Sequence, residues 1–522
     1  MPAPSFDLGQ PRRHAGSTGS TDTPAGKPTP RPTATVRPRQ WQTQLIALLR
    51  RRLEQSRNAG GGSGNAAAAP SADVLINAGP GAGKTLGALL SFQHLQHEGQ
   101  LQRFLVFCHR SSIAEQWLAA AVRLGLRLQE WQADADQQAL SASGDGLLIT
   151  YQAAGRHRDL LEAQLRATRW GPWMAIADEV HHLGLDPDEP EASAWGQAFS
   201  RLSAGARLRV GLTGTPFRAD NLAFCAARRQ RVHDGDSWVE QIVPDLSVEP
   251  RELILAGDVR PLEFRFQDGW VDHGRLAEQL ESGESVGVGD VERSPLSLEQ
   301  RESWRARNLR RAIQLGDSSS IALRLLLNAR RRLELVRRQH PGAGGLVIAR
   351  NIAHARRICG LLEEQGDRVQ LVHSQDPEAH ERLKAFKAGA GDWLVSIDMC
   401  AEGFDAPRLR VVAYLTTVVT RTRFVQAITR AVRIDGDRAG LESVPRQASS
   451  VFAPADPLLM QVARTWSLTE PYVLQPPATA APEESGAGPM RGPSLPLQAL
   501  EDGAGAVIRM RGPELPNFRM QR

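Results

Sequence analysis

A glycine-rich loop between an apolar run and a helical run has residue types and a spacing suited to phosphate chemistry. The stretch Ala78–Thr85 has the sequence AGPGAGKT, follows the apolar residues 74–76 and precedes the helical run Leu86–Leu95. Glycines let backbone N–H groups close around an anion, and the following helix directs its positive end there. In such a loop Lys84 reaches the β- and γ-phosphates, and the Thr85 hydroxyl holds Mg²⁺. The sequence therefore predicts a nucleoside triphosphate site formed by Gly79, Gly81, Gly83, Lys84 and Thr85.

Two adjacent carboxylates, Asp178 and Glu179, follow the apolar run Met174–Ala177 and precede two histidines. In a parallel sheet, side chains at the carboxyl end of a strand border the ligand crevice. We expect Asp178 to hold Mg²⁺, directly or through water, and Glu179 to polarise the water that attacks the γ-phosphate. An isolated Asp-Glu pair is usually part of a solvated loop. Its position at a strand end, after a phosphate loop, favours catalysis.

Two arginines in the second half of the chain are spaced for phosphate contact. If residues 426–433 form a helix, Gln426, Arg430 and Arg433 share one face through i, i+4 and i+3 spacing. Guanidinium groups are suited to bidentate contact with phosphate. An arginine that reaches a γ-phosphate held by another domain is an arginine finger, and it accelerates hydrolysis by ~10³–10⁵. The alternative is a solvated basic helix face.

Strand-type and helical segments alternate around these residues in two consecutive series. The predicted strands are 74–76, 104–107, 147–150, 174–177 and 208–212, then 345–348, 369–372, 393–397 and 411–414. The predicted helices include 40–53, 86–95, 352–364 and 377–387. Strands separated by helices indicate parallel sheets with helices on both faces. We therefore expect an α/β fold with two tandem parallel-sheet domains.

Changes in composition indicate the domain boundaries. The predicted segments are a disordered tail at 1–35, an ATP-binding domain at 36–255, a second domain at 256–470 and a low-complexity tail at 471–522. Within the second domain, residues 268–344 are charged and mostly helical in pattern, and we interpret them as an insertion. The Gly/Ala/Ser-rich residues 58–72 are expected to form a flexible loop.

The bulk composition excludes some classes of protein. No apolar run in the 522 residues approaches the roughly 20 needed to span a bilayer, and the N-terminus lacks the apolar core of a signal peptide. We therefore expect a cytoplasmic location and no membrane partner. The four cysteines lie far apart, which argues against a zinc ribbon or a disulfide framework. The net charge of +5 favours a polyanionic partner, although an arginine-rich composition by itself is the alternative.

The order of these motifs resembles the superfamily 2 helicases of the DEAD/DEAH-box (DExH) type, which have two RecA-like domains. Arg37-Pro38-Arg39-Gln40 resembles their adenine-reading segment, with Gln40 as the adenine contact. The Ala-x-x-Gly-x-Gly-Lys-Thr loop is similar to the phosphate loop of this group. Residues 395–409, which include 402–407, resemble motif V, with Asp405 near the nucleotide, and residues 426–433 resemble motif VI with Gln426 at the nucleotide. The resemblance spans roughly residues 37–435 and implies ATP and Mg²⁺ as cofactors.

The segments that contact nucleic acid in this family are matched less closely. Residues 107–110 stand where the family has a Pro-Thr-Arg-like turn, and Arg110 and Gln116 are the candidates for its backbone contact. Thr150-Tyr151-Gln152 resembles a further strand-contacting segment. The Asp-Glu-x-His motif and Thr213–Arg218 resemble DNA-acting relatives, which favours DNA over RNA as the partner.

The resemblance implies an ATP-dependent helicase or translocase that couples ATP hydrolysis at an inter-domain cleft to movement on nucleic acid or its unwinding. Two alternatives stay open. One is a duplex DNA translocase, the motor of a restriction or repair complex, that does not separate strands. The other is a nucleotide-switched clamp on nucleic acid. Any protein partners are expected at the insertion 268–344 or at the tails.

Overall fold

The computed structural model of the chain describes most of the two predicted domains. The described residues are 36–60, 72–109, 111–133, 144–167, 170–183, 192–214, 228–234, 237–272, 293–316, 320–397, 404–434, 442–467, 472–474 and 507–511. The predicted tail at 1–35, most of the loop at 58–72 and most of the tail at 471–522 lie outside these ranges. No helix within them is long and apolar enough to cross a membrane.

The first sheet contains seven strands in the order β3-β4-β2-β5-β6-β1-β9, and every neighbouring pair is parallel. Their bounds are β1 Ala72–Ala78, β2 Arg103–Cys108, β3 Leu128–Glu130, β4 Gly146–Thr150, β5 Trp173–Ala177, β6 Leu208–Thr213 and β9 Leu246–Val248. All five strands predicted for this half of the chain fall within observed strands. The predicted parallel sheet is confirmed.

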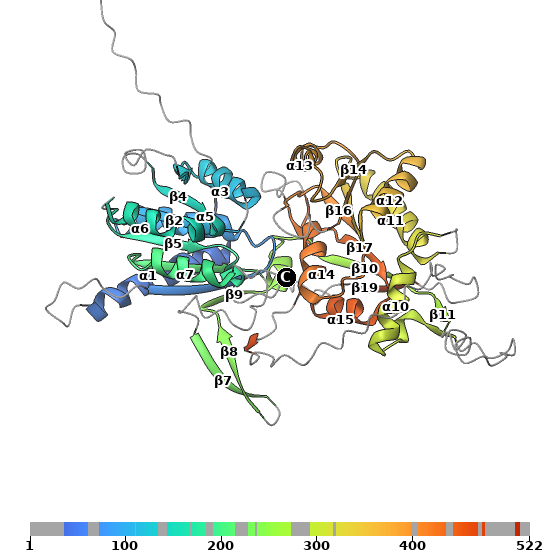
Figure 1. Cartoon of the computed structure of the whole chain (residues 1–522), viewed down its shortest axis with the longest axis horizontal. Coiled ribbons are helices and arrows are strands. Elements are labelled where there is room, and N and C mark those ends of the chain that lie inside the picture. The colour runs from blue at the N-terminus through green and yellow to red at the C-terminus, as the bar shows by residue number, and fades with distance from the viewer. Residues whose placement is uncertain are drawn as a thin grey trace, which may run out of the picture. The chain divides into compact units, whose positions relative to one another are not determined.

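Helices cover both faces of this sheet (Figure 1). They are α1 Gln40–Gly60, α2 Lys84–His97 and α3 Ser111–Arg123 against one face, and α5 Tyr151–Arg156, α6 Arg158–Ala167 and α7 Ala192–Leu202 against the other. Because successive side chains of a strand point to opposite faces, Val74 and Ile76 join the first apolar cluster and Leu75 joins the second. Both faces are therefore buried, as expected for a parallel sheet.

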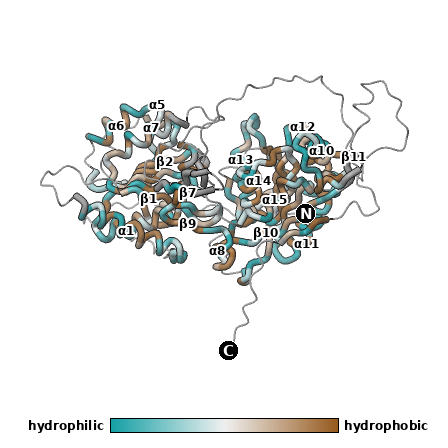
Figure 2. Tube along the Cα trace, turned by 90° about the horizontal axis from the view of Figure 1, so that it is seen from below, coloured by the Kyte–Doolittle hydropathy of each residue, from teal (hydrophilic) through white to brown (hydrophobic). Residues whose placement is uncertain are grey.

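The second sheet has the order β14-β15-β13-β16-β17-β10-β19. Its strands are β10 Leu262–Gln267, β13 Gly344–Ala349, β14 Val369–Val372, β15 Trp393–Ser396, β16 Leu409–Leu415, β17 Ser449–Pro454 and β19 Val507–Arg511. All pairs are parallel except β10 with β19. Helices α11 Ile321–Arg337 and α12 Ile352–Glu364 cover one face, and α13 Ala379–Lys387, α14 Arg421–Ile428 and α15 Pro457–Thr465 cover the other. Figure 2 shows apolar residues on central strands such as β1 and hydrophilic residues on outer helices such as α12.

The stretch interpreted as an insertion, 268–344, contains both surface and core elements. It includes the strand pair β11 Trp270–Asp272 and β12 Arg293–Pro295, the turn η2 Leu296–Leu298 and the helices α10 Glu302–Ala312 and α11. Residues 273–292 and 317–319 lie outside the described part. Helix α11 buries Leu325, Leu326 and Leu333 in one cluster with Val347 and Phe452 of the sheet. Because these side chains complete the core, α11 is an integral helix of the second domain.

The remaining described elements connect or extend the two sheets. They are the helix α8 Pro250–Leu255, the short turns η1 Val180–Leu183 and η4 Thr429–Val432, and a small antiparallel sheet of β7 Arg228–Asp234, β8 Ser237–Val243 and β18 Tyr472–Leu474. Helix α8 lies in sequence between the last strand of the first sheet, β9, and the first strand of the second, β10.

Candidate nucleotide-binding site

The loop between β1 and α2 has the backbone of a phosphate-binding loop. Gly81 and Gly83 have φ of 81° and 83°, in the left-handed region that favours glycine. A Cβ on Gly79 would stand 2.9 Å from Cγ of Pro250, so this position is also closely packed. The glycine spacing noted in the sequence therefore corresponds to real backbone requirements.

Three side chains, one just before α1 and two in its first turn, hold the carbonyl groups of this loop. Arg39 Nη1 donates to the carbonyl oxygens of Gly81 and Ala82, each at 2.8 Å. Trp41 Nε1 donates to the Ala82 carbonyl at 3.0 Å, and Gln42 Nε2 donates to the Gly83 carbonyl, also at 3.0 Å. Because these bonds occupy carbonyl oxygens that would repel an anion, they favour phosphate binding at the loop.

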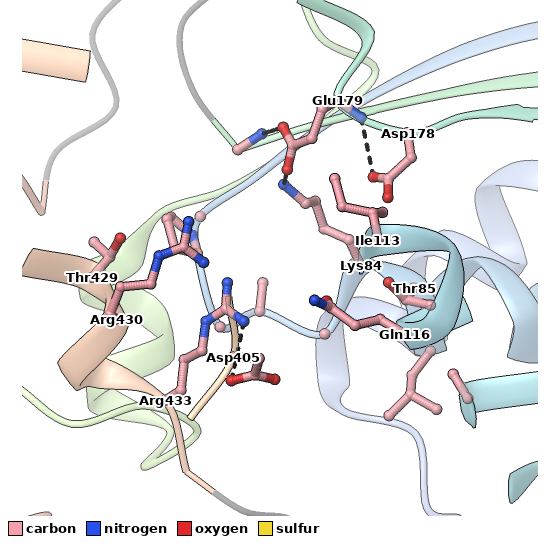
Figure 3. Close-up of a pocket in the computed structure, with 18 of the residues that line it drawn as sticks. Lys84, Thr85, Ile113, Gln116, Asp178, Glu179, Asp405, Thr429, Arg430 and Arg433 are labelled. Carbon is pink, nitrogen blue, oxygen red and sulfur yellow. Dashed lines mark hydrogen bonds and ion pairs between the residues drawn. The ribbon is translucent and has the colours of Figure 1, made fainter. Parts of the chain in front are cut away.

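Lys84 and Glu179 form an ion pair at the end of the first sheet. Lys84 Nζ lies 2.6 Å from Glu179 Oε1, and the Gly214 N–H donates to Glu179 Oε2 at 3.4 Å (Figure 3). Among the described residues Glu179 is the one non-glycine with a left-handed backbone, at φ 48°. A residue held in this conformation costs energy and is often found at functional sites. In this structure the Lys84 ammonium group is paired with Glu179, the carboxylate that we expect to polarise water.

Asp178 is buried below this pair and is held by three neighbours. Its carboxylate accepts from Trp117 Nε1 at 2.7 Å and from the Glu179 N–H at 3.0 Å, while its backbone carbonyl accepts from the Tyr151 hydroxyl at 2.8 Å. Burial and repulsion by Glu179 raise the pKa of Asp178 to about 6, against the opposing effect of Lys84 and the two hydrogen bonds. Asp178 is thus a carboxylate held in one orientation that takes up a proton at mildly acidic pH.

The second domain contributes Gln426, Arg430 and Arg433 to the same cavity of about 490 Å³ that Lys84 lines. Arg430 Nη1 donates to the Phe404 carbonyl at 2.8 Å. Figure 3 shows Arg430 and Arg433 extending toward the phosphate loop from the side opposite α2. The predicted face of one helix is wrong in detail, because α14 ends at Ile428 and a 3₁₀ turn places Arg433 on extended backbone. The three side chains nevertheless meet at the cavity.

Asp405 also lines the cavity and pairs with Arg433, whose Nη1 lies 3.1 Å from Asp405 Oδ1. Burial tends to raise the pKa of Asp405, but the Arg433 guanidinium outweighs it and holds this pKa below its usual range. The carboxylate therefore stays ionised and fixes the orientation of the guanidinium.

Other residues named from the sequence lie elsewhere. Gln40 is exposed and is not among the residues that line the cavity, where its neighbour Arg39 is found, so the adenine contact stays a prediction. Gln116 lines the cavity beside Thr85 (Figure 3). Tyr151 is buried beneath Asp178. Arg110, Glu402, Gly403 and residues 215–218 lie outside the described part of the chain.

The donor set fits Mg²⁺ held jointly with phosphate. Thr85 and Asp178 both line the cavity, and their hydroxyl and carboxylate oxygens are the ligands that Mg²⁺ prefers. In the described ranges no group of three or more His, Cys, Asp or Glu side chains is placed to hold a metal ion. Since Mg²⁺ commonly uses one or two protein ligands plus substrate phosphates, two such residues are sufficient.

Several residues of the site were not found from the sequence. The donors Arg39, Trp41 and Gln42 precede the loop by some forty positions, and Trp117 is 61 positions from Asp178. Arg39 and Gly214 do lie in segments singled out from the sequence, 37–40 and 213–218, but neither residue was given a role there. A Cβ on Gly214 would lie 2.5 Å from Lys84 Nζ, so a side chain here would displace the lysine.

Two family models match the chain, one in each domain. The family model described as the type III restriction enzyme, res subunit, matches residues 35–218, and that of the helicase conserved C-terminal domain matches residues 328–435. An uncharacterized protein of Mycobacterium tuberculosis is 31% identical over 438 residues, which are 83% of this chain and 66% of that protein. The chain thus spans about two thirds of the length of this relative.

Two solved structures of restriction enzymes are also similar. A fragment described as an HsdR subunit of a type I enzyme from Vibrio vulnificus has a TM-score of 0.49 and 15% identity, covering 83% of this chain and 67% of its own. The type ISP restriction-modification enzyme LlaBIII bound to DNA has a TM-score of 0.45 and 13% identity, covering 80% and 28%. On its two family matches, and with its two parallel sheets, the chain belongs to helicase superfamily 2 and has two RecA-like domains.

Proposed function

We propose that this chain is a nucleic-acid-stimulated ATPase that couples ATP hydrolysis to movement on nucleic acid or its unwinding. One observation supports this function above the others: Lys84, Glu179 and Arg433 line a single cavity, although they come from two different domains. The cavity also has the volume of a pocket for a nucleotide-sized ligand. Such a site is complete only when both domains contribute to it.

The ion pair between Lys84 and Glu179 suggests how ATP activates the site. The γ-phosphate would attract Lys84 Nζ, which now lies 2.6 Å from Glu179 Oε1. Glu179 would then be released to accept a proton from the attacking water. Mg²⁺ held by Thr85 and Asp178 would neutralise charge on the phosphates.

The two arginines supply the contribution of the second domain. In the transition state negative charge is spread over the oxygens around the transferred phosphoryl group, and a guanidinium directed at them stabilises that charge. Arg433 is already oriented by Asp405 and lies at the phosphate loop, where its Cγ is 3.7 Å from the position of a Cβ on Gly81. Hydrolysis would therefore depend on the relative position of the two domains, which is how a nucleotide cycle can drive movement on a polymer.

The polymer is proposed to be DNA, on the similarity of Thr213–Arg218 to DNA-acting relatives, and the chain's net charge of +5 suits a polyanion. Contacts to the phosphate backbone carry no sequence information, so binding should be salt-dependent and largely independent of sequence. Strand displacement by the protein would indicate a helicase. Triplex displacement without strand displacement would indicate a duplex translocase.

Steady-state ATP hydrolysis tests the function directly. We expect turnover to rise with single-stranded DNA, duplex DNA or RNA, and the most effective polymer identifies the partner. Lys84→Ala should abolish turnover, whereas Lys384→Ala, which removes an exposed lysine of α13, should leave it unchanged. Turnover by Lys84→Ala close to that of the wild type would refute the assignment of the phosphate loop. A single burst of ATP consumption without turnover would indicate a clamp.

A further inference from the structure

Three consecutive residues after α8, Asp258, Val259 and Arg260, contact the phosphate loop on one side and the arginine-bearing segment on the other. We call Asp258–Arg260 the strut. It lies in sequence between α8 and β10, where the chain passes from the first sheet to the second. No part of it was singled out from the sequence as functional.

Of the first two residues of the strut, Val259 contacts the phosphate loop directly and Asp258 is linked to it through Arg39. Asp258 Oδ1 pairs with Arg39 Nε at 3.4 Å, and Arg39 in turn donates to the carbonyl oxygens of Gly81 and Ala82. Val259 is buried, and its Cγ1 lies 2.9 Å from the position that a Cβ would take on Gly81. The loop therefore packs directly on Val259 of the strut, and Arg39 bridges the loop carbonyl groups to Asp258.

Arg260 makes the contacts to the second domain. It is 3% exposed, and its backbone N–H donates to the Val432 carbonyl at 2.8 Å. Its guanidinium donates to the carbonyl oxygens of Pro407, at 3.0 Å, and of Arg433. Arg260 thus holds the main chain of Arg433 itself and of the segment that follows Asp405.

The orientation of Arg260 is fixed by the partly buried carboxylate of Glu442. Glu442 accepts from Arg260 Nε at 3.2 Å and from Nη2 at 2.7 Å, and it also accepts from Arg410 Nη2 at 2.9 Å. Burial tends to raise the pKa of Glu442, but the neighbouring guanidinium groups of Arg260 and Arg410 hold it below its usual range. A buried guanidinium is costly unless it is paired, so Glu442 keeps Arg260 in this geometry.

We propose that the strut is a positioning element that sets the place of Arg433 relative to the phosphate loop, with Arg260 as its central residue. Arg260 faces the main chain of Arg433 and not the cavity, so it acts on the reaction only through Arg433. The catalytic part of this inference rests on the proposed function. The mechanical link from the second domain to the phosphate loop does not depend on the proposed function.

Kinetics of Arg260→Met test the catalytic part. Misplacement of Arg433 should lower kcat about 10- to 100-fold, with KM for ATP changed less than about twofold. In an Arg433→Ala background, Arg260→Met should lower kcat no further, because its effect passes through the missing guanidinium. Losses that multiply in the double variant, or an unchanged kcat in Arg260→Met, would overturn the proposal.

Arg305→Met is the matched control for loss of a buried arginine. Arg305 Nη1 pairs with Asp456 at 3.0 Å in the same domain, and neither residue lines the cavity. We expect this variant to lower the unfolding temperature and to keep the wild-type kcat. An equal loss of kcat in both variants would show that general destabilisation of the domain explains the effect.

Hydrogen–deuterium exchange tests the mechanical link between the strut and the phosphate loop, and this test does not require the protein to hydrolyse ATP. In Arg260→Met, amide exchange should rise in residues 404–434 and also in residues 79–85, which lie in the other domain. Arg305→Met should leave residues 79–85 protected. Unchanged exchange at 79–85 in Arg260→Met would overturn the strut, whereas absence of ATP hydrolysis by the wild type would refute only the proposed function.

Discussion

Replacing Asp178 with asparagine should stabilise the folded protein at neutral pH in the absence of Mg²⁺. The pKa of Asp178 is raised from 3.8 to about 6, chiefly by burial, so its ionised form is disfavoured in the folded state. Between these two pKa values the carboxyl group binds more protons in the folded than in the unfolded state. Its contribution to stability is therefore fully present below pH 3.8, where the group is protonated in both states. That contribution is lost as the pH rises from 3.8 to about 6.

The size of the effect follows from the pKa. Each tenfold change in proton affinity corresponds to about 1.4 kcal/mol, so ionised Asp178 costs about 3 kcal/mol at pH 8 and about half of that at pH 5. Asparagine removes this cost at every pH. It also loses one of the two accepted hydrogen bonds, from Trp117 or Glu179, which costs about 1 kcal/mol and does not depend on pH.

Urea denaturation with EDTA present, followed by tryptophan fluorescence, measures the difference. We expect the free energy of unfolding of Asp178→Asn, relative to the wild type, to increase by about 1.5 kcal/mol between pH 5 and pH 8. Asp159→Asn removes an exposed carboxylate of α6 and should show no such change. A difference that is constant over this range, or that decreases with pH, would contradict the burial of an ionisable Asp178.

Two further predictions concern the glycine beside the lysine and a buried thiol. Gly214→Ala places a Cβ 2.5 Å from Lys84 Nζ, so the ammonium must move, and we expect ATP affinity measured by a fluorescent analogue to fall about tenfold. Unchanged affinity would show that the lysine adapts freely. Burial, followed by repulsion from Glu363, raises the pKa of the Cys359 thiol to about 12, so Cys359 should resist iodoacetamide at pH 8 in the native protein. Peptide mass mapping before and after denaturation checks this, and rapid labelling of Cys359 in the native protein would contradict it.

Local patterns in the sequence predicted much of the fold. The phosphate loop, the carboxylates after β5 and nine strands of the two sheets depend on residues adjacent in the chain, and the glycines at 81 and 83 occupy left-handed backbone. Strands such as β9, β10 and β17 were not predicted. β9 has only three residues, which is too short for a periodic pattern, whereas the alternating Leu262, Phe264 and Phe266 of β10 are a local strand pattern that was overlooked.

Tertiary structure alone decided which side chains complete the site. Arg39 meets the carbonyl groups of a loop 42 positions away, Trp117 meets Asp178 across 61 positions, and Arg260 meets Glu442 across 182. The structure also shows that α14 ends at Ile428, before Arg433, and the periodic pattern of the sequence does not indicate this end. Motifs can be read from the chain because their residues are neighbours in it. Residues brought together by packing have no characteristic spacing in the sequence, because the path of the folded backbone determines which of them meet.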